Sequence, residues 1–209
     1  MIKEFNSQND YNRFIYSITK NNSIGFGGEG ECFLGKDNLA YKVINSDSLL
    51  NYDVDSIITK DKYNLSHFAF PIDLYTDSNH EKLYGYSSEY FRNDKFKEVE
   101  EEDIDFYLEC LISSYYKMLD EVKILSKDKI FLFDIINNII YCNYEIVAID
   151  TLCYFKKKES TYKANKDMLL NAIENEFYFY FDLDKTFQDE KSIEQIARNV
   201  KKYVKKIKY

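Results

Sequence analysis

The spacing of apolar residues changes from a helical pattern to a strand pattern within the first 44 residues of the chain. The first group has helical spacing and consists of Tyr11, Phe14, Ile15 and Ile18. Side chains three and four residues apart lie on one face of a helix. Over residues 24–44 the apolar residues instead form short runs, separated by glycine, asparagine and aspartate, which is typical of strands joined by tight turns. The pattern predicts an amphipathic helix within residues 1–20, followed by strand, turn, strand, turn and strand.

Helical spacing returns after this sheet region. Residues 45–66 begin with the potential caps Ser46 and Asp47, and one modest helix is predicted there. Its apolar stripe would consist of Leu50, Val54, Ile57 and Ile58. Two more strands are predicted at 68–75 and 82–91, because turn formers fill residues 77–80 between them. Residues 1–91 therefore read as a small sheet that carries one inserted helix.

The second half of the chain is mainly helical. A long amphipathic helix is predicted over about 103–126, after an acidic connector at 92–105. Two short strands at 138–142 and 145–149 follow, and further helices are predicted at 166–179 and 192–207. The predicted fold class is α+β, with a sheet domain over 1–91 and a helical domain over 92–209.

Composition and charge limit the classes of partner. The formal net charge is −8 over 209 residues, which argues against nucleic acid as the main partner because binding to a phosphate backbone needs a cationic face. No apolar run reaches membrane-spanning length, and the first residues lack the apolar core of a signal peptide. We therefore expect a cytoplasmic protein without a membrane partner. The four cysteines form no C-x-x-C pair, which disfavours a structural zinc site.

Three glycines, Gly25, Gly27 and Gly30, have G-x-G-x-x-G spacing, which three phosphate-binding devices share. A Walker loop is excluded because Glu31 and Cys32 stand where it needs lysine and serine or threonine. A dinucleotide-binding turn needs a helix to begin within the motif, whereas a strand and a turn follow here. The remaining device is a glycine-rich hairpin over a nucleotide, with a lysine on the next strand.

That lysine is Lys42, in the run Ala40-Tyr41-Lys42-Val43, and Cys32 takes the place usually held by valine. In these features the chain resembles the protein-kinase-like superfamily. The resemblance continues after the long helix and covers roughly residues 20–155. Matches to the catalytic aspartate, the metal-binding asparagine and the aspartate of D-F-G follow in the family's order at Asp134, Asn138 and Asp150.

The resemblance implies a two-lobed fold with a small antiparallel N-lobe sheet, one N-lobe helix and a reduced, mainly helical C-lobe. It implies that Lys42 holds the α- and β-phosphates of ATP and that Asn138 and Asp150 bind Mg²⁺, with Mn²⁺ as the alternative metal. Asp134 would orient the acceptor hydroxyl of a protein or small molecule, and residues 86–90 would form the hinge that meets the adenine. The residues implied to contact the nucleotide are Ile24, Gly25, Gly27, Gly28, Gly30, Cys32, Ala40, Lys42, Ser88 and Glu89.

The chain also departs from the family's pattern. Leu132 and Phe133 replace the family's histidine and arginine, and Thr151-Leu152 replaces Phe-Gly. The loop from Asp134 to Asn138 is one residue short, and no Ala-Pro-Glu sequence follows Asp150. The helix at 45–66 contains no glutamate to pair with Lys42, so that Asp53 and Asp61 are the candidates. Two hypotheses follow: a minimal ATP-dependent kinase, or a pseudokinase that senses nucleotide or acts as a scaffold.

Each candidate residue also has a purely structural interpretation. Lys42 would then extend its ammonium from a sheet edge, while Asp134, Asn138 and Asp150 would be turn residues at a hairpin. The lysines at 156–158 and those of the last helix are interpreted as a solvated face, with a patch for a substrate or an acidic partner as the alternative.

Overall fold

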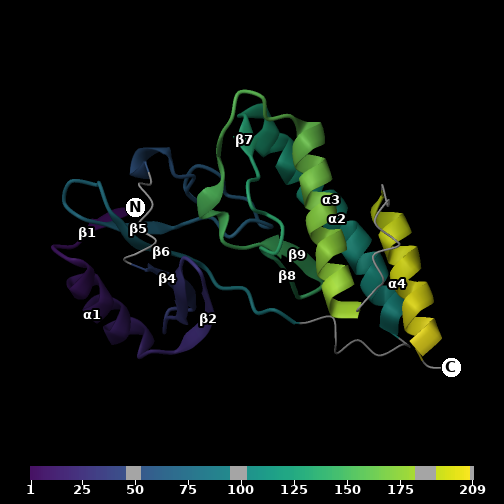
Figure 1. Ribbon diagram of the computed structural model, residues 1–209, viewed down its shortest axis with the longest axis horizontal. Coiled ribbons are helices and arrows are strands. Elements are labelled where there is room, and N and C mark those ends of the chain that lie inside the picture. Colours follow the sequence, from purple (N-terminus) through teal and green to yellow (C-terminus); the bar gives the residue numbers. More distant parts are fainter. Residues whose placement is uncertain (46–52, 95–102, 182–191, 208–209) are drawn as a thin grey trace. The chain divides into compact units, whose positions relative to one another are not determined.

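The computed structural model describes residues 1–45, 53–94, 103–181 and 192–207. The chain forms two compact units, and Figure 1 labels their elements. Unit 1 comprises Met1–Asn64 and Ala69–Tyr90, and unit 2 comprises Leu65–Phe68 and Phe91–Tyr209. The first unit contains the large sheet and the second contains the long helices, so the α+β fold class is confirmed.

Unit 1 is built on a six-stranded sheet with the strand order β1-β5-β6-β4-β3-β2. Its strands are β1 (Ile2–Glu4), β2 (Ser23–Gly27), β3 (Gly30–Leu34), β4 (Leu39–Ile44), β5 (Asp73–Thr76) and β6 (Leu83–Glu89). Neighbours pair antiparallel except for β1, which runs parallel to β5. The three strands predicted over 24–44 are confirmed. Strand β1 was not predicted, since three residues are too short to show a period.

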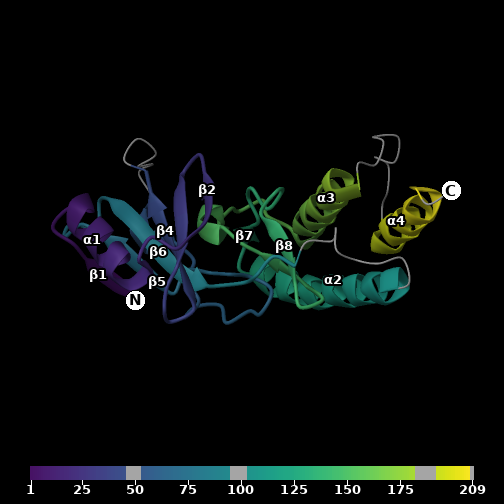
Figure 2. The same cartoon turned by 90° about the horizontal axis from the view of Figure 1, so that it is seen from below.

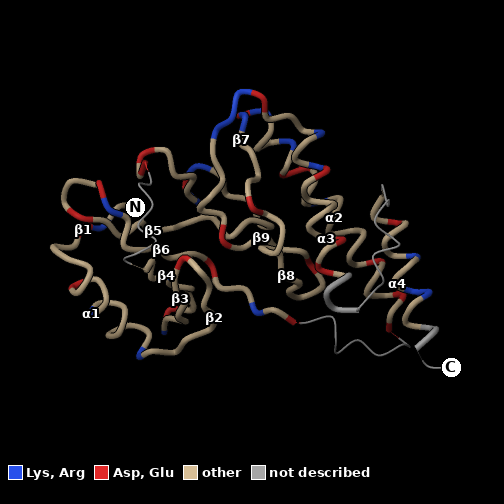
Figure 3. The backbone as a smooth tube through the Cα atoms, viewed as in Figure 1, with Lys and Arg blue, Asp and Glu red and all other residues tan. Residues whose placement is uncertain are grey.

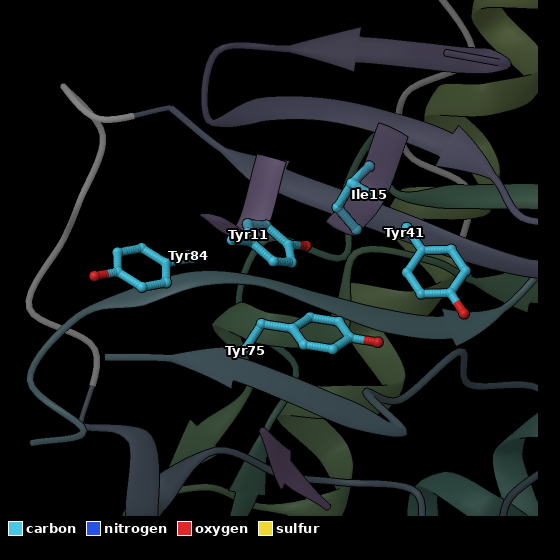
Figure 4. Close-up of a cluster of buried hydrophobic side chains, with 5 residues drawn as sticks. All are labelled: Tyr11, Ile15, Tyr41, Tyr75 and Tyr84. Atoms are coloured by element: carbon cyan, nitrogen blue, oxygen red, sulfur yellow. The ribbon is translucent and has the colours of Figure 1, made fainter. Parts of the chain in front are cut away.

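Helix α1 (Gln8–Thr19) confirms the predicted N-terminal helix. It begins after Ser7, whose side chain accepts a hydrogen bond from the backbone N–H of Asp10, as N-caps do. Tyr11 and Ile15 point from α1 onto a set of sheet tyrosines (Figure 4). The Tyr11 ring stacks on that of Tyr75 with centroids 5.1 Å apart, and its hydroxyl donates to the Lys42 carbonyl at 2.9 Å. Aromatic burial on this face therefore fixes the helix to the sheet.

The helix predicted at 45–66 is wrong over its described part. Residues 46–52 lie outside the described residues, and from Asp53 onward the chain forms one short 3₁₀ turn, η2 (Val54–Ser56). Ile57 is already extended, with ψ 135°. The Ser56 hydroxyl donates to the Asp53 carbonyl at 2.8 Å, and such local bonds compete with helix formation. Val54, Ile57 and Ile58, the described residues of the predicted stripe, are still buried, but from backbone that is not α-helical.

The strand predicted at 68–75 is also wrong in its first half, because β5 begins only at Asp73. Phe68 instead makes an isolated parallel bridge to Ala148 of unit 2, whose N–H donates to the His67 carbonyl at 2.8 Å. Pro71 interrupts the run between these two pairings; it has no N–H to donate, and its carbonyl accepts from the N–H of Lys60.

The described residues of unit 2 form three α-helices, which lie side by side in Figures 1 and 2. They are α2 (Ile104–Lys127), α3 (Tyr162–Phe181) and α4 (Ile193–Ile207). The predicted helices are confirmed, although α3 begins four residues earlier than the predicted start at 166. Fully buried side chains of α2, including Met118, Val122 and Leu125, form much of the core. No helix within the described residues is both long and apolar enough to cross a membrane.

Short β elements connect these helices. The predicted hairpin is present as β8 (Ile139–Cys142) and β9 (Glu145–Ala148). A second pair, which was not predicted, joins β7 (Ile130–Phe131) to β10 (Phe155–Lys156). Between β9 and β10 lies a 3₁₀ turn, η5 (Thr151–Cys153). The segments that carry Asp134 and Asp150 are therefore short loops anchored at both ends by strands.

We predict that Tyr11→Phe destabilises unit 1 by about 1–3 kcal/mol, because the buried hydrogen bond from the Tyr11 hydroxyl to the Lys42 carbonyl is lost. The matched control is Tyr16→Phe on the same helix, where the side chain is 60% exposed and a change within about 0.5 kcal/mol is expected. Urea unfolding followed by circular dichroism measures both. Equal stability of the two variants would show that the Tyr11 hydroxyl does not contribute.

Candidate functional site

Lys42 lies on β4, an interior strand of the sheet of unit 1. The register places Lys42 opposite Cys32 of β3 and Tyr86 of β6, and directly paired residues project from the same face. Tyr41 projects from the other face, where α1 packs. The Lys42 side chain is only 6% exposed, and its Nζ lies 5.9 Å from the centroid of the Tyr86 ring. The sheet thus directs a buried ammonium group to the face opposite α1.

The carboxylate beside this ammonium belongs to Glu29. Its Oε2 lies 3.1 Å from Lys42 Nζ, and its carbonyl accepts from the N–H of Asn45 at 2.9 Å. Glu29 occupies the turn between β2 and β3, thirteen residues before Lys42. The prediction of Asp53 or Asp61 as the partner overlooked it. The carboxylate of Asp61 instead lies 3.9 Å from the amino group of Met1.

The glycines of the β2–β3 hairpin differ in how closely other atoms approach them. A Cβ at Gly25, Gly27 or Gly28 would meet no atom within 4 Å, whereas one at Gly30 would lie 2.0 Å from the carbonyl oxygen of Val43. None of the six glycines, all of which are described, has a positive φ. Gly30 therefore permits β3 to approach β4 closely, and the other three leave open space along an exposed ribbon.

The remaining residues predicted to contact the nucleotide lie on neighbouring strands. Ala40 pairs with Ser88 in the β4–β6 ladder and shares the face of Lys42 by alternation. Ser88 is buried, whereas Glu89 forms an ion pair with Lys60 at 2.6 Å. Ile24 lies at the register shift in β2 and is 40% exposed. Unit 1 therefore brings Cys32, Ala40, Lys42 and Ser88 together across three adjacent strands.

In unit 2, Asp134 and Asn138 form one closed loop. The side-chain amide of Asn138 donates to the Asp134 carbonyl at 2.7 Å and to its carboxylate at 3.3 Å. Asp134 and Asn137 have positive φ angles of 61° and 70°. Such backbone is uncommon outside glycine, and it persists only where the surrounding structure imposes it. The amide nitrogen of Asn138 holds the loop, which directs its amide oxygen away from Asp134.

Asp150 lies beside this loop. It has left-handed backbone, φ 53° and ψ 47°, at the junction of β9 and η5. The N–H of Ile149 donates to the Asn138 carbonyl at 2.8 Å, so Asn138 and Asp150 lie at the same end of the β8–β9 hairpin. Burial raises the pKa of Tyr154, and the nearby charges of Asp150 and Asp134 raise it further. The structure therefore brings together the three residues predicted in this half of the chain.

The donor set limits the metal that this unit can hold. Among the described residues, no group of three or more histidine, cysteine, aspartate or glutamate side chains is arranged for a metal ion. Asn138 and Asp150 offer an amide oxygen and a carboxylate. Mg²⁺ is commonly held by one or two carboxylates together with substrate phosphates. These two residues therefore fit a metal ion that arrives with phosphates, and not a site made of protein ligands alone.

Two polar networks that the sequence analysis missed support the loops of unit 2. Asn165 of α3 is completely buried; its amide donates to the Ile130 carbonyl and the Ser126 hydroxyl, and its oxygen accepts from the N–H of Leu132. This network fixes the backbone two residues before Asp134. The sequence offered one signal for this network, because Asn165 is a polar residue among the apolar positions of α3.

The second network begins at Glu121 of α2. Its carboxylate accepts from the backbone N–H groups of Ser66 and His67 at 2.9 and 3.0 Å, and the carbonyl of His67 in turn accepts from Ala148. Burial raises the pKa of Glu121, but hydrogen bonds from His67 and Ser66 outweigh it, so the net pKa is lowered. Through this chain of bonds α2 supports the strand that leads to Asp150.

Comparison of the sequence with protein-family models and with curated proteins found no match.

We predict that Glu121→Gln costs about 1–3 kcal/mol at pH 7, because one of the two carboxylate oxygens that accept from the backbone N–H groups of Ser66 and His67 is replaced by a donor. A carboxyl group whose pKa is lowered by folding stabilises the protein above its ordinary pKa and ceases to do so as the pH falls through the folded value. The difference between wild type and variant should therefore narrow below pH 4.5, the ordinary value.

Urea unfolding at a series of pH values from 7 downward measures this difference. Glu109→Gln, an exposed change on the same helix, is the control and should leave stability unchanged at every pH. A difference for Glu121→Gln that stays constant below pH 4.5 would contradict the assigned role of its charge.

Proposed function

We propose that the protein binds ATP with Mg²⁺ and transfers the γ-phosphate to a hydroxyl group of a protein or small molecule, in the manner of a protein-kinase-like enzyme. The observation that carries the proposal is the position of Lys42. Its ammonium is buried on an interior strand, on the same face as Cys32 and Ala40, and next to the glycine hairpin. An exposed lysine at a sheet edge would have supported the purely structural interpretation, but Lys42 is at neither an edge nor the surface.

A buried ammonium group is costly unless it has anionic partners. An apolar residue in the middle of β4 would serve the sheet equally well, so a charge there favours a functional role. The hairpin supplies one carboxylate, from Glu29, at 3.1 Å. Phosphates of a nucleotide are the second kind of anion that a lysine in this position suits. The exposed glycines of β2 carry no side chain that would keep the same phosphates away from the backbone.

Unit 2 carries the candidate residues for the chemical step. Asn138 and Asp150 fit a Mg²⁺ ion that accompanies phosphates, and Asp134 in the adjoining loop is the candidate to orient the acceptor hydroxyl. Phosphoryl transfer needs positioning and charge neutralisation more than covalent participation by the protein. The tight hydrogen-bonded loop around Asp134 supports such a role, because it holds the carboxylate in one place before any ligand binds.

A second function, nucleotide binding without transfer, is favoured by the partner of Lys42. In the family that the chain resembles, a helix glutamate orients the lysine, whereas here the carboxylate comes from the glycine hairpin itself. The described part of residues 45–66 forms no α-helix that presents such a glutamate. A pseudokinase that senses nucleotide would need Lys42 and the hairpin but not the geometry for transfer.

Two measurements separate these functions. If ATP with Mg²⁺ binds the folded state, then saturating nucleotide should raise Tm by on the order of 5 °C. Lys42→Met should abolish this shift, whereas Lys36→Met, an exposed change in the β3–β4 turn, should preserve it. No shift for the wild-type protein would overturn nucleotide binding altogether.

Transfer is measured with radiolabelled ATP, using autophosphorylation and generic protein acceptors as readouts. Asp150→Asn should reduce the signal by about 100-fold or more, since Mg²⁺ loses its carboxylate ligand, and Asp167→Asn on the exposed side of α3 should not reduce it. A thermal shift without any transfer above the Asp150→Asn background would establish the pseudokinase function instead.

We further predict that Glu29→Gln strengthens ATP binding by about threefold to tenfold, because a carboxylate within 3.1 Å of Lys42 competes with phosphates for the ammonium and repels them. Isothermal titration of ATP·Mg²⁺ measures the change. Glu31→Gln, at the second residue of β3, is the control and should alter affinity by less than about twofold. Weaker binding of ATP by Glu29→Gln would show that Glu29 supports the nucleotide.

A further inference from the structure

An exposed aromatic group lies next to a cluster of lysines in unit 2. Phe131, Phe133 and Phe155 contact one another, with ring centroids 5.8 to 6.5 Å apart. Phe133 is 50% exposed and Phe155 is 41% exposed. Lys129 and the exposed run 156–158 flank these rings. We call this set the phenylalanine–lysine surface.

The four lysines of this surface outnumber the acidic residues beside them in the chain, Asp128, Asp134 and Glu159, so the local net charge is opposite in sign to that of the whole chain. The formal net charge of the protein is −8, yet lysines gather around β7 (Figure 3). The Nζ atom of Lys157 lies 4.6 Å from the centroid of the Phe131 ring, within the range of a cation–π interaction. An aromatic patch with a basic rim on an acidic protein marks a surface suited to an anionic partner that also carries apolar groups.

The surface is also preorganised. Phe131 and Phe155 are paired in the β7–β10 ladder, and the N–H of Lys157 donates to the Lys129 carbonyl at 2.8 Å. The Ser160 hydroxyl donates to the Ile130 carbonyl at 2.9 Å, where the buried amide of Asn165 also donates. A surface that is already ordered loses less conformational entropy when a partner binds.

We propose that the phenylalanine–lysine surface binds an acidic segment of a partner protein, with an apolar side chain of that segment on Phe133 and Phe155 and its carboxylates facing the lysines at 156–158. Phe133 directly precedes Asp134 in the chain, but this binding does not depend on nucleotide chemistry. Failure of one proposal therefore leaves the other standing.

The composition of the surface favours a peptide over other anions. Long phosphate polymers would meet the repulsion of an acidic protein beyond a short cationic region. An anionic membrane would need a wider apolar face than two half-exposed rings. A short acidic segment needs only a few carboxylates and one apolar side chain. The lysines can bind those carboxylates, and the two exposed rings can contact that side chain.

A displayed library of random twelve-residue peptides tests the proposal on the full-length protein. We expect the enriched peptides to be rich in aspartate and glutamate around an aromatic or aliphatic residue. One synthetic, fluorescein-labelled peptide from the enriched set then serves as the probe for fluorescence anisotropy. Its affinity should fall by about tenfold between 0.05 and 0.3 M salt, because the contacts are exposed charges.

Variants locate the binding. Phe133→Ser and the double change Lys156→Glu/Lys158→Glu should each weaken binding by about tenfold or more. Phe106→Ser, which removes another phenylalanine that is 54% exposed, and Lys202→Glu on α4 are matched controls and should leave affinity within about twofold. All the substituted residues are exposed, and circular dichroism verifies that each variant remains folded.

The proposal is overturned if the enriched peptides carry no excess of acidic residues, or if the Phe133 and Lys156/Lys158 variants bind the probe as well as the wild type does. It is also overturned if phosphatidylserine vesicles or a single-stranded oligonucleotide bind more tightly than the peptide and lose affinity with the same variants. Vesicle sedimentation and oligonucleotide anisotropy provide these two comparisons.

Discussion

A buried ammonium group requires an anion beside it, and this requirement determines much of unit 1. Lys42 can remain inside the sheet because the turn of the β2–β3 hairpin folds back to place Glu29 at 3.1 Å. That approach depends on β3 lying close to β4, which only a glycine at position 30 permits. Tyr11 holds the same strand from the other face through the Lys42 carbonyl. Helix and hairpin therefore both contact Lys42, the helix through the backbone carbonyl and the hairpin through the side-chain ammonium.

In unit 2 the comparable constraint is backbone strain. Asp134, Asn137 and Asp150 all have positive φ, a conformation that costs free energy in residues other than glycine. Hydrogen bonds from polar side chains on the helices help to offset this cost. Asn165 anchors the segment before Asp134, and Glu121 anchors residues that support the strand before Asp150. Helix packing, a property of the core, thus fixes the conformation of exposed loops.

Periodicity predicted most of the regular elements, because helices and strands that pack on a core must repeat at 3.6 or 2 residues. It failed at 53–66, where Val54, Ile57 and Ile58 are buried without forming an α-helix. The spacing of apolar residues there indicated correctly that they are buried, but it did not determine the backbone conformation. The candidate residues of each unit were found from motif spacing. Glu29 was missed because its pairing with Lys42 arises from hairpin register, and Asn165 was missed because its four partners are set by tertiary packing alone.

The short segment Leu65–Phe68 belongs to unit 2, although the sequence on either side of it belongs to unit 1. Through His67 and Phe68 it adds a parallel bridge next to the β8–β9 hairpin. The two units are consequently not interchangeable modules that recombination or truncation could separate at one point. A chain that began at residue 91 would lack this bridge and the backbone N–H groups that Glu121 binds, so unit 2 draws part of its support from a segment that lies within the sequence of unit 1.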